Sequence, residues 1–449
     1  MHIDLTQGKI GKSLLLFSLP MIFGNMLQQL YNVADTLIVG KTIGATALAA
    51  VGSSYSLMVL LTSAILGLCI GSGVVFAQLY GAKRMDDLKI SMFNSFVFIL
   101  IVSVLINILS YRLLERFIVW LNIPAEAVAD TREYLSIIFT GIIAVYLYNY
   151  FAAVLRSMGN TMVPLIFLAV SAITNIVLDI VFIVRFRMGV AGAAWATVIA
   201  QVLSAVCITI YFFTQARHLC PSQEHMRYDK KLLSFVMVNS SLTAFQQSIM
   251  NFGILMVQGL VNSFGFYVSA AFAAVVKIDA FAYIPAQDFG NAYSTFIAQN
   301  FGARKPDRIQ KGSKAAVVIS VLFCVIASAC VYVFARPLMM LFVNASEMEI
   351  IQIGIRYLHI EGACYLGIGI LFLLYGFYRG IGRSTMSIVL TVISLGSRVL
   401  LAYVLSAIPQ IGLVGIWWAI PIGWLLADTV GIWYFFARKD QLIGTEAAL

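Results

Sequence analysis

The sequence predicts an all-α membrane protein with twelve transmembrane helices in two six-helix lobes. Three observations support this fold class. Of the 449 residues, 61% are hydrophobic and only 11% are charged, whereas soluble domains are about half apolar and about a quarter charged. The hydrophobic residues gather in long segments, and the mean hydropathy is +0.93. The two halves of the chain also share sequence matches in the same order, which predicts an internal repeat.

The predicted spans are long enough to cross a bilayer, which takes about 20 apolar residues per helix. The short alternating segments of an outer-membrane barrel are absent. Several predicted spans exceed the length of a flat crossing, so we expect some helices to tilt or kink. The twelve spans are 14–40, 46–80, 90–111, 133–156, 162–184, 190–213, 234–262, 267–300, 314–335, 352–379, 385–407 and 412–436.

The distribution of positive charge predicts the topology. If the N-terminus is cytoplasmic, 19 of the 29 Lys and Arg residues fall on the inside and eight on the outside, while Lys277 and Arg398 fall within spans. Basic loops favour the cytoplasmic side, so we expect both termini in the cytoplasm and the protein in the plasma (inner) membrane. The net charge of +9 is therefore a topology signal, and we expect no nucleic-acid partner.

The internal repeat has an offset of about 220 residues. Each predicted half holds six spans, and an even number gives both halves the same orientation. The repeat is therefore parallel, with a pseudo-two-fold axis along the membrane normal, and a substrate pathway is expected at its interface. The matched segments are Gln28-Gln29 with Gln246-Gln247, 77–84 with 298–305, 155–162 with 378–385 and 188–196 with 411–419.

The longest polar stretch near the middle of the chain separates the two halves. We expect an N-terminal lobe at 1–213, a cytoplasmic linker at 214–233 and a C-terminal lobe at 234–449.

Ionisable residues inside spans are costly and are functional candidates by default. Asp35 lies in the first span and Asp179 in the fifth, where Asn175 shares its helix face at spacing i, i+4. Thr197 lies in the sixth span. Two carboxylates, an amide oxygen and a hydroxyl suit Na⁺ or a proton, and the absence of His and Cys argues against zinc. The alternative is a structural hydrogen-bond network that fixes helix packing.

The repeat sharpens the interpretation of this acidic group. Asp35 corresponds to Gly253, Asn175 to Arg398, Asp179 to Ala402 and Thr197 to Ile420, so the acids belong to one half only. A buried carboxylate resists being charged, and a proton or Na⁺ relieves that cost. Binding of the ion would thus favour one of two conformations of the surrounding helices.

Other residues of the first half are weaker candidates. Pro20 interrupts the first span and predicts a hinge or a plain kink. Gln28, Tyr31 and Asn149 are polar or amphipathic side chains within spans, which line a substrate cavity or bond neighbouring helices.

In the second half, Lys277, Asp288 and Arg398 predict a charge network between helices, either a structural salt bridge or a substrate site. Glu361 follows His359 near the start of a span, so we expect it to be hydrated.

Motifs of enzymes are absent from the sequence. There is no GxSxG, no HExxH and no GxxxxGK[ST], so we expect neither a catalytic centre nor a fused ATPase, and no cofactor. Energy must then come from an ion gradient or from a separate partner.

Several segments together resemble one transporter family. They are Pro20 with QQLYNVADTLIVG (28–40), AQ-x-x-GA-[KR] after spans two and eight, R-x-x-G-[NR] before spans five and eleven, and TNIVLD with MGVAGAAWAT. With these marks the chain resembles the multidrug and toxic compound extrusion (MATE) family, within the multidrug/oligosaccharidyl-lipid/polysaccharide exporter superfamily.

The resemblance implies export of amphipathic, often cationic small molecules in exchange for Na⁺ or H⁺. It carries the family's ion site to Asp35, Asn175, Asp179 and Thr197. We expect a monomer whose partners are the lipid bilayer and small organic substrates.

Two alternatives stay open at this point. A lipid-linked oligosaccharide flippase of the same superfamily would line its cavity with several cations for pyrophosphate, and only Lys277 and Arg398 lie within spans here. A channel or membrane enzyme belongs to a different class, and uptake into vesicles driven by an ion gradient would separate a transporter from a channel.

Overall fold

The computed structural model describes residues 3–120, 123 and 125–443, and these residues form helices joined by short turns. Besides α-helices there are four short 3₁₀ segments and one π-helical segment, η2. The elements are α1 Ile10–Thr42, α2 Ala45–Gly81, α3 Met85–Arg112, α4 Leu114–Trp120, η1 Ala125–Ala127, α5 Val128–Phe139, α6 Ile142–Ser157, α7 Met162–Asp179, η2 Ile180–Arg185, α8 Gly189–Thr214, η3 Arg217–Leu219, η4 Gln223–His225, α9 Lys230–Asn262, α10 Phe266–Gly302, α11 Pro306–Val333, α12 Ala335–Met340, α13 Met348–Ile360, η5 Gly362–Cys364, α14 Tyr365–Gly380, α15 Ser384–Ser406, α16 Leu413–Ala437 and α17 Lys439–Ile443.

The prediction of an all-helical, multi-span protein is confirmed. Within the described residues, ten helices are long and apolar enough to cross a membrane, or eleven if α5 and α6, which meet at 44°, form one broken span. The remaining predicted span, 234–262, is helical as part of α9. Amide side chains such as those of Gln246, Gln247 and Asn251 make α9 less apolar than the other long helices.

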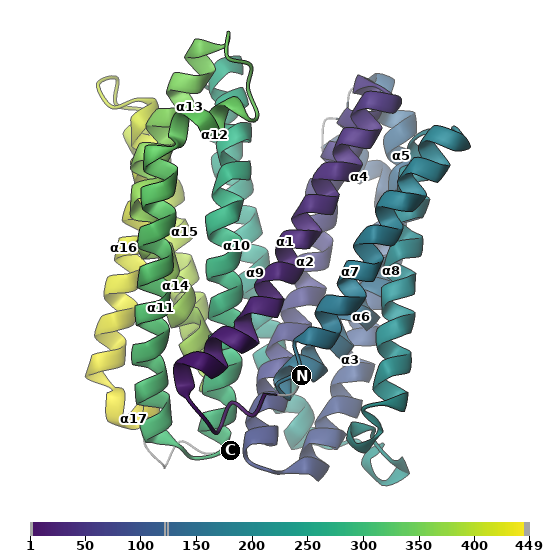
Figure 1. The fold of residues 1–449 in the computed structure, drawn as a ribbon, viewed down its shortest axis with the longest axis vertical. Helices are drawn as coiled ribbons and strands as arrows, with labels where there is room; N and C mark the ends of the chain where they lie inside the picture. Colours follow the sequence, from purple (N-terminus) through teal and green to yellow (C-terminus); the bar gives the residue numbers. More distant parts are fainter. Residues whose placement is uncertain (1–2, 121–122, 124, 444–449) are drawn as a thin grey trace. The chain divides into compact units, whose positions relative to one another are not determined.

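The contacts divide the described chain into two compact units, and the divisions fall inside two helices. Unit 1 contains Phe23–Ala244 together with Ile3, and unit 2 contains Asp4–Ile22 and the chain from Phe245 onward. Helix α1 thus passes from unit 2 into unit 1 just after Pro20, and α9 passes from unit 1 into unit 2. Figure 1 shows α1 as a long, continuous helix.

The first residues of the chain belong to unit 2 because the start of α11 binds their backbone. The guanidinium of Arg308 donates to the carbonyl oxygens of Leu5 at 3.0 Å and Gly8 at 2.9 Å. Asn300 donates to the Leu5 oxygen at 3.1 Å, and the Leu5 side chain is fully buried. These bonds fix the segment that precedes α1 against unit 2.

In unit 1, α6 occupies the centre and contacts α2, α3 and α8. Its tyrosines pack on Phe96 of α3, with ring centroids 5.7 Å away for Tyr146 and 5.3 Å for Tyr150. Both hydroxyls donate to α3 carbonyls, from Tyr146 to Phe96 at 2.7 Å and from Tyr150 to Met92 at 2.5 Å. Burying these rings while bonding their hydroxyls makes α6 a rigid core element.

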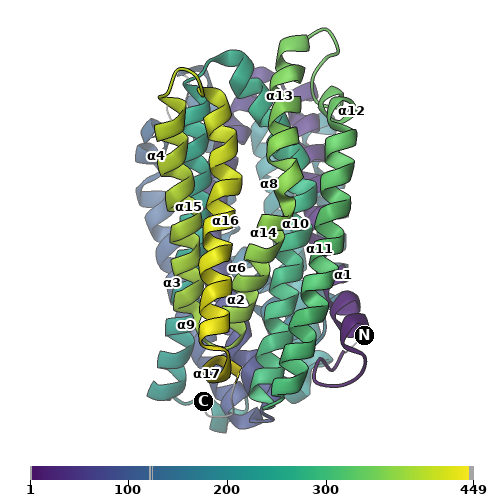
Figure 2. The same cartoon turned by 90° about the vertical axis from the view of Figure 1, so that its left-hand side faces the viewer.

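In unit 2, α14 occupies the corresponding centre, against α10, α11, α15 and α16 (Figure 2). It packs on α10 through glycine, since a Cβ at Gly376 would lie 2.4 Å from the Gly290 carbonyl oxygen. In unit 1, α2 and α6 also approach through a small residue, but this contact is looser, since a Cβ at Gly73 would lie 3.5 Å from the Cβ of Ala153. Small residues at both places let helix backbones approach closely, as in other membrane proteins.

Gly376→Ala should destabilise unit 2, because the new methyl group meets a backbone oxygen that cannot move away. Overpacking of this kind costs about 1–3 kcal/mol. The matched control is Gly396→Ala on α15, where a Cβ would meet nothing within 4 Å. That variant should be neutral or gain up to about 1 kcal/mol, because alanine is the better helix former. Thermal unfolding of both variants in one detergent checks the contrast, and equal melting temperatures would contradict it.

Candidate cation site

The candidate site is built by three helices of unit 1. Asp35 lies in the second half of α1, and Asn175 and Asp179 lie one turn apart on α7. Asp179 is the last residue of α7, directly before the π-helical segment η2, where Phe186 N–H donates to the Val181 oxygen five residues back at 2.9 Å. Single π-helical turns often mark functional sites, because the wider turn displaces the side chains around it.

The site is buried, and several of its side-chain oxygen atoms have no hydrogen-bond partner among the described residues. The side chains of Asp35, Asn175 and Asp179 are 9%, 2% and 0% exposed. Among the described residues, four of their oxygens have no hydrogen-bond partner: Asp35 Oδ1, Asn175 Oδ1, Asp179 Oδ1 and Asp179 Oδ2. A buried acceptor without a partner costs about 1–3 kcal/mol, and more when it is charged, so four of them in one place indicate a ligand.

Asn175 is oriented by the fourth predicted residue. Its Nδ2 donates to Thr197 Oγ1 on α8 at 3.3 Å. Because the amide nitrogen is used in this bond, the unpaired Oδ1 is fixed on the other side of the amide group. Thr197 therefore fixes the orientation of the Asn175 amide group.

The two carboxyl groups interact with each other and with a residue that the sequence analysis did not select. The charges of Asp35 and Asp179 are close enough to interact, and both act on the hydroxyl of Tyr134 in α5. Tyr134 is 7% exposed. The internal repeat could have pointed to Tyr134, since the pair Tyr134-Leu135 recurs in the second half as Tyr357-Leu358. The structure thus brings together all four predicted residues and adds a tyrosine.

The set of oxygen atoms fits a hard monovalent cation or a proton. Carboxylate and amide oxygens suit hard cations, while zinc prefers nitrogen and sulfur. Within the described residues there is no group of three His, Cys, Asp or Glu side chains that could hold a metal. Two negative charges in a low-dielectric site are costly unless a positive charge compensates them.

The weaker candidates of the first half lie in different surroundings. Gln28 bonds Tyr31, and Tyr31 interacts with Asp35 one turn further along α1, so these two border the cation site. Asn149 instead donates to the Val145 oxygen of its own helix at 2.8 Å. Pro20 lies inside α1, two residues before the helix leaves unit 2.

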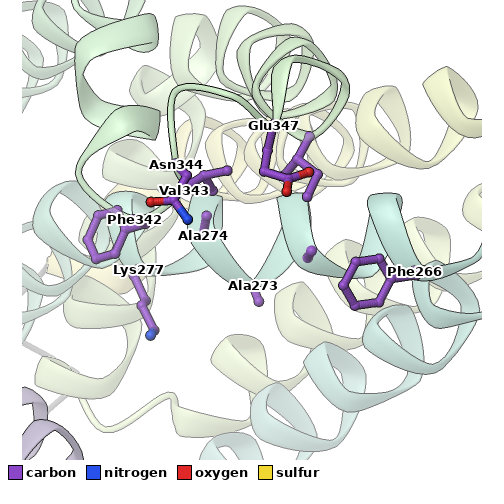
Figure 3. A pocket seen from close by; sticks show the side chains of 10 residues that line it. Phe266, Ala273, Ala274, Lys277, Phe342, Val343, Asn344 and Glu347 are labelled. Atoms are coloured by element: carbon purple, nitrogen blue, oxygen red, sulfur yellow. The ribbon is translucent and has the colours of Figure 1, made fainter. Parts of the chain in front are cut away.

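In unit 2, the predicted charged residues lie in different surroundings. Lys277 borders a pocket of about 330 Å³ together with Phe342, Asn344 and Glu347, as Figure 3 shows. Its ammonium group lies 5.8 Å from the centre of the Phe342 ring. Arg398 interacts with Glu361, Tyr283 and Asp279. The network of Lys277, Asp288 and Arg398 stays a prediction, and Asp288 is 3% exposed.

Two acids of unit 2 differ from the sequence-based expectation. Glu361 was expected to be hydrated, but it is only 6% exposed, because α10, α11 and α16 pack on α13 and α11 and α14 pack on η5 at this point. Asp428 of α16 is 7% exposed and was not selected, although it lies within a predicted span. Its position inside the apolar run 412–436 was the available signal.

Comparison with known protein families shows a match over most of the chain. The profile of the MatE family matches residues 20–181 and 243–404. The two matches lie on the two halves of the chain, at an offset within the range of the internal repeat.

Curated relatives cover almost the full length. The probable multidrug resistance protein YpnP of Bacillus subtilis is 31% identical over 395 residues, which is 87% of each chain. The multidrug export protein MepA of Staphylococcus aureus is 24% identical over 97% of this chain and 96% of its own. A solved structure, described as the outward-facing conformation of a multidrug resistance MATE family transporter, aligns with a TM-score of 0.92 at 23% identity over 98% of both chains. At that identity the structural likeness shows the fold alone.

Thr197→Val should weaken cation binding without unfolding the protein. Valine keeps the shape but removes the oxygen that orients Asn175, and a lost hydrogen bond of about 1 kcal/mol corresponds to a roughly fivefold weaker affinity. Titration calorimetry with Na⁺ on the purified protein measures the change. The matched control is Thr209→Val on the same helix, whose hydroxyl bonds the Ala205 oxygen at 2.6 Å. If Thr197→Val binds Na⁺ as the control does, Thr197 has no role in the site.

Proposed function

Since the chain belongs to the MatE family of multidrug and toxic compound extrusion transporters and is not an enzyme, we propose that it exports small amphipathic, often cationic molecules in exchange for Na⁺ or H⁺. The observation that carries this proposal is the set of four unpaired, buried oxygens on Asp35, Asn175 and Asp179. Family membership makes the protein a cation-coupled antiporter, and the oxygens indicate where this chain would bind the cation.

The mechanism follows from the cost of burying charge. With both carboxylates ionised and no cation bound, the site carries two negative charges in a low-dielectric surrounding. Binding Na⁺ or a proton lowers this cost and changes which helix arrangement around α1, α5 and α7 is favoured. A ligand shifts such an equilibrium only by its difference in affinity for the two states, and compensation of buried charge supplies a large difference.

The elements around the site are able to respond to occupancy. Asp35 lies on α1, which contains Pro20 and continues from one compact unit into the other. Asp179 lies at the junction of α7 with a π-helical segment. The irregular point of α7 lies directly after Asp179, and that of α1 lies fifteen residues before Asp35 on the same helix; at both points backbone angles change more easily than in a regular helix. We therefore assign Pro20 the role of a hinge for α1.

The substrate is proposed to bind next to the cation. Gln28 and Tyr31 border Asp35 on α1, and an aromatic ring beside an amide suits an amphipathic cation. An organic cation and the coupling ion would then compete for the same negative charge, which is the requirement for exchange. Asn149, which bonds its own helix, is a weaker part of this cavity.

The cellular arrangement follows from the charge pattern. We propose that the protein acts as a monomer in the plasma (inner) membrane with both termini in the cytoplasm, because most Lys and Arg residues then lie on the cytoplasmic side. Export therefore runs from the side of the termini to the opposite side. The lobes proposed for substrate transport correspond to the two sequence halves, 1–213 and 234–449, with the linker 214–233 between them.

Asp35→Asn and Asp179→Asn should each abolish gradient-driven efflux. Each variant removes one of the two negative charges and thereby the advantage of binding a cation, so efflux should fall to the rate of protein-free vesicles. Reconstituted vesicles loaded with a fluorescent cationic dye, with Na⁺ and pH gradients imposed separately, measure this and also identify the coupling ion.

The matched control for this assay is Asp440→Asn, an exposed aspartate on α17 that should transport as the wild type does. Insertion and folding of each variant are verified by its melting temperature in detergent. Efflux that continues undiminished in both site variants would refute coupling through unit 1.

A further inference from the structure

A pocket in unit 2 lies outside everything that the proposed function uses. It has a volume of about 330 Å³ and lies between the first turns of α10 and the connection from α12 to α13 (Figure 3). Figure 2 shows α12 and α13 at the end of unit 2 that is opposite α17. With the termini in the cytoplasm, as the loop charges favour, this end of unit 2 faces the outer leaflet of the membrane.

Small side chains on α10 leave the pocket open. Ala273 and Ala274 precede Lys277 by one helical turn, so the three residues share one face of the helix. Their methyl groups are too short to fill the space up to residues 341–347, which connect α12 to α13. The ammonium group of Lys277 lies 5.8 Å from the centre of the Phe342 ring. The pocket therefore combines an apolar floor with a positive charge.

Two opposite charges border this pocket without neutralising each other. Lys277 and Glu347 are both exposed. Among the described residues, the ion pairs within 4.0 Å are formed by other side chains, so the ammonium and the carboxylate are not paired. A purely cationic ligand would be repelled by the lysine, and a purely anionic ligand by the glutamate. A ligand that carries both charges satisfies both groups through charge-assisted hydrogen bonds.

The two charges lie at different depths. Helix α10 has 37 residues and is thus about 55 Å long, well beyond the hydrocarbon thickness of about 30 Å. Lys277 lies about 16 Å inward from Phe266, the first residue of this helix. Figure 3 shows Glu347 closer to Phe266 and Lys277 closer to Phe342. The carboxylate therefore lies on the water side of the ammonium group.

A lysine at this depth needs polar surroundings. Charged side chains within a span are costly, and the four-carbon stem of lysine lets its charge reach the headgroup layer. At the offset that relates 77–84 to 298–305, Lys277 corresponds to Ser56 of α2. The repeated fold is thus built in unit 1 with an uncharged residue at this position, and the positive charge of unit 2 has a purpose of its own.

The rim of the pocket is apolar and exposed. Phe266 and Leu341 are 76% and 74% exposed, and Val276 and Phe342 are exposed as well. Exposed apolar patches with polar groups beside them mark contacts with membranes or partners. A water-soluble ligand would leave these side chains uncovered, whereas the acyl chains of a lipid would cover them.

We propose that this pocket binds the headgroup of a phospholipid that carries a primary ammonium group, taken from the outer leaflet. The Lys277 ammonium binds the phosphate, and the ammonium group of the lipid donates hydrogen bonds to the Glu347 carboxylate. The order of the charges agrees with this assignment, because the ammonium group of such a lipid lies on the water side of its phosphate. The volume of about 330 Å³ lies within the range of small-molecule pockets.

Binding of a phosphatidylethanolamine with a fluorescent acyl chain to the purified full chain in detergent tests this inference. The wild type should bind one such lipid per chain and should prefer it about tenfold over phosphatidylglycerol, which has the phosphate but no ammonium group. Lys277→Met keeps the apolar stem and should weaken the binding of both lipids about tenfold. Glu347→Gln should remove the preference between the two lipids.

Matched controls change the same kinds of charge outside the pocket. Glu349→Gln on α13 and Lys311→Met on α11 alter exposed side chains and should bind both lipids as the wild type does. A third pocket variant, Ala273→Leu, fills the space while keeping both charges, and it should lose lipid binding. It decides the question if a charge variant does not fold.

The outcomes also separate this inference from the proposed function. Equal binding of the two lipids by the wild type, or pocket variants that bind as the controls do, would overturn the inference. Displacement of the lipid by an equal concentration of soluble phosphoethanolamine would indicate a free zwitterion, and displacement by a cationic dye would indicate a substrate subsite; each result overturns the lipid site. Na⁺ binding should persist in every pocket variant, because it depends on unit 1, so failure of that site would be seen independently.

Discussion

The constraint on which this structure depends is that oxygen atoms buried in an apolar membrane protein need a partner. Most buried polar groups meet that need through their own helices, as the hydroxyls of Ser54, Thr131 and Thr391 do with carbonyls one turn earlier. The acids and the amide of unit 1 do not, and they leave four oxygens unpaired in one place. Such an arrangement is costly unless a positive charge completes it, and the proposed coupling of cation binding to transport rests on that cost.

Helix irregularities lie beside the buried acids in both units. Asp179 precedes a π-helical segment, and Glu361 separates α13 from a 3₁₀ turn. Regular helices pair all their interior backbone N–H and C=O groups and are stiff, whereas the hydrogen-bond pattern at these junctions is already irregular. A change in charge at a junction therefore alters helix direction more easily than the same change within a regular helix. The close packing of Gly376 on Gly290 shows the opposite case, a contact that fixes two helices.

The repeat gives both units the same framework and leaves their chemistry different. Tyrosine occurs at equivalent positions, Tyr134 and Tyr357, and each lies next to acids. Asn175 in one unit is replaced by Arg398 in the other. Exchange of an amide for a guanidinium changes the charge of the group by one while the helices around it stay the same. Duplicated transporter scaffolds can in this way bind different ligands at related positions.

The sequence by itself determined the class of the molecule and most of the candidate site. Apolar length, loop charge and the ordered repeat are local or additive properties, so they predicted an all-helical multi-span protein, and the i, i+4 spacing placed Asn175 and Asp179 on one face. The tertiary structure alone decided which distant residues meet. Tyr134 joins the acids of unit 1, Glu361 is buried where hydration was expected, and Asp279 is held by Tyr357 and Tyr365. These contacts arise between helices, and helix periodicity fixes which way a side chain points but not which neighbour it faces.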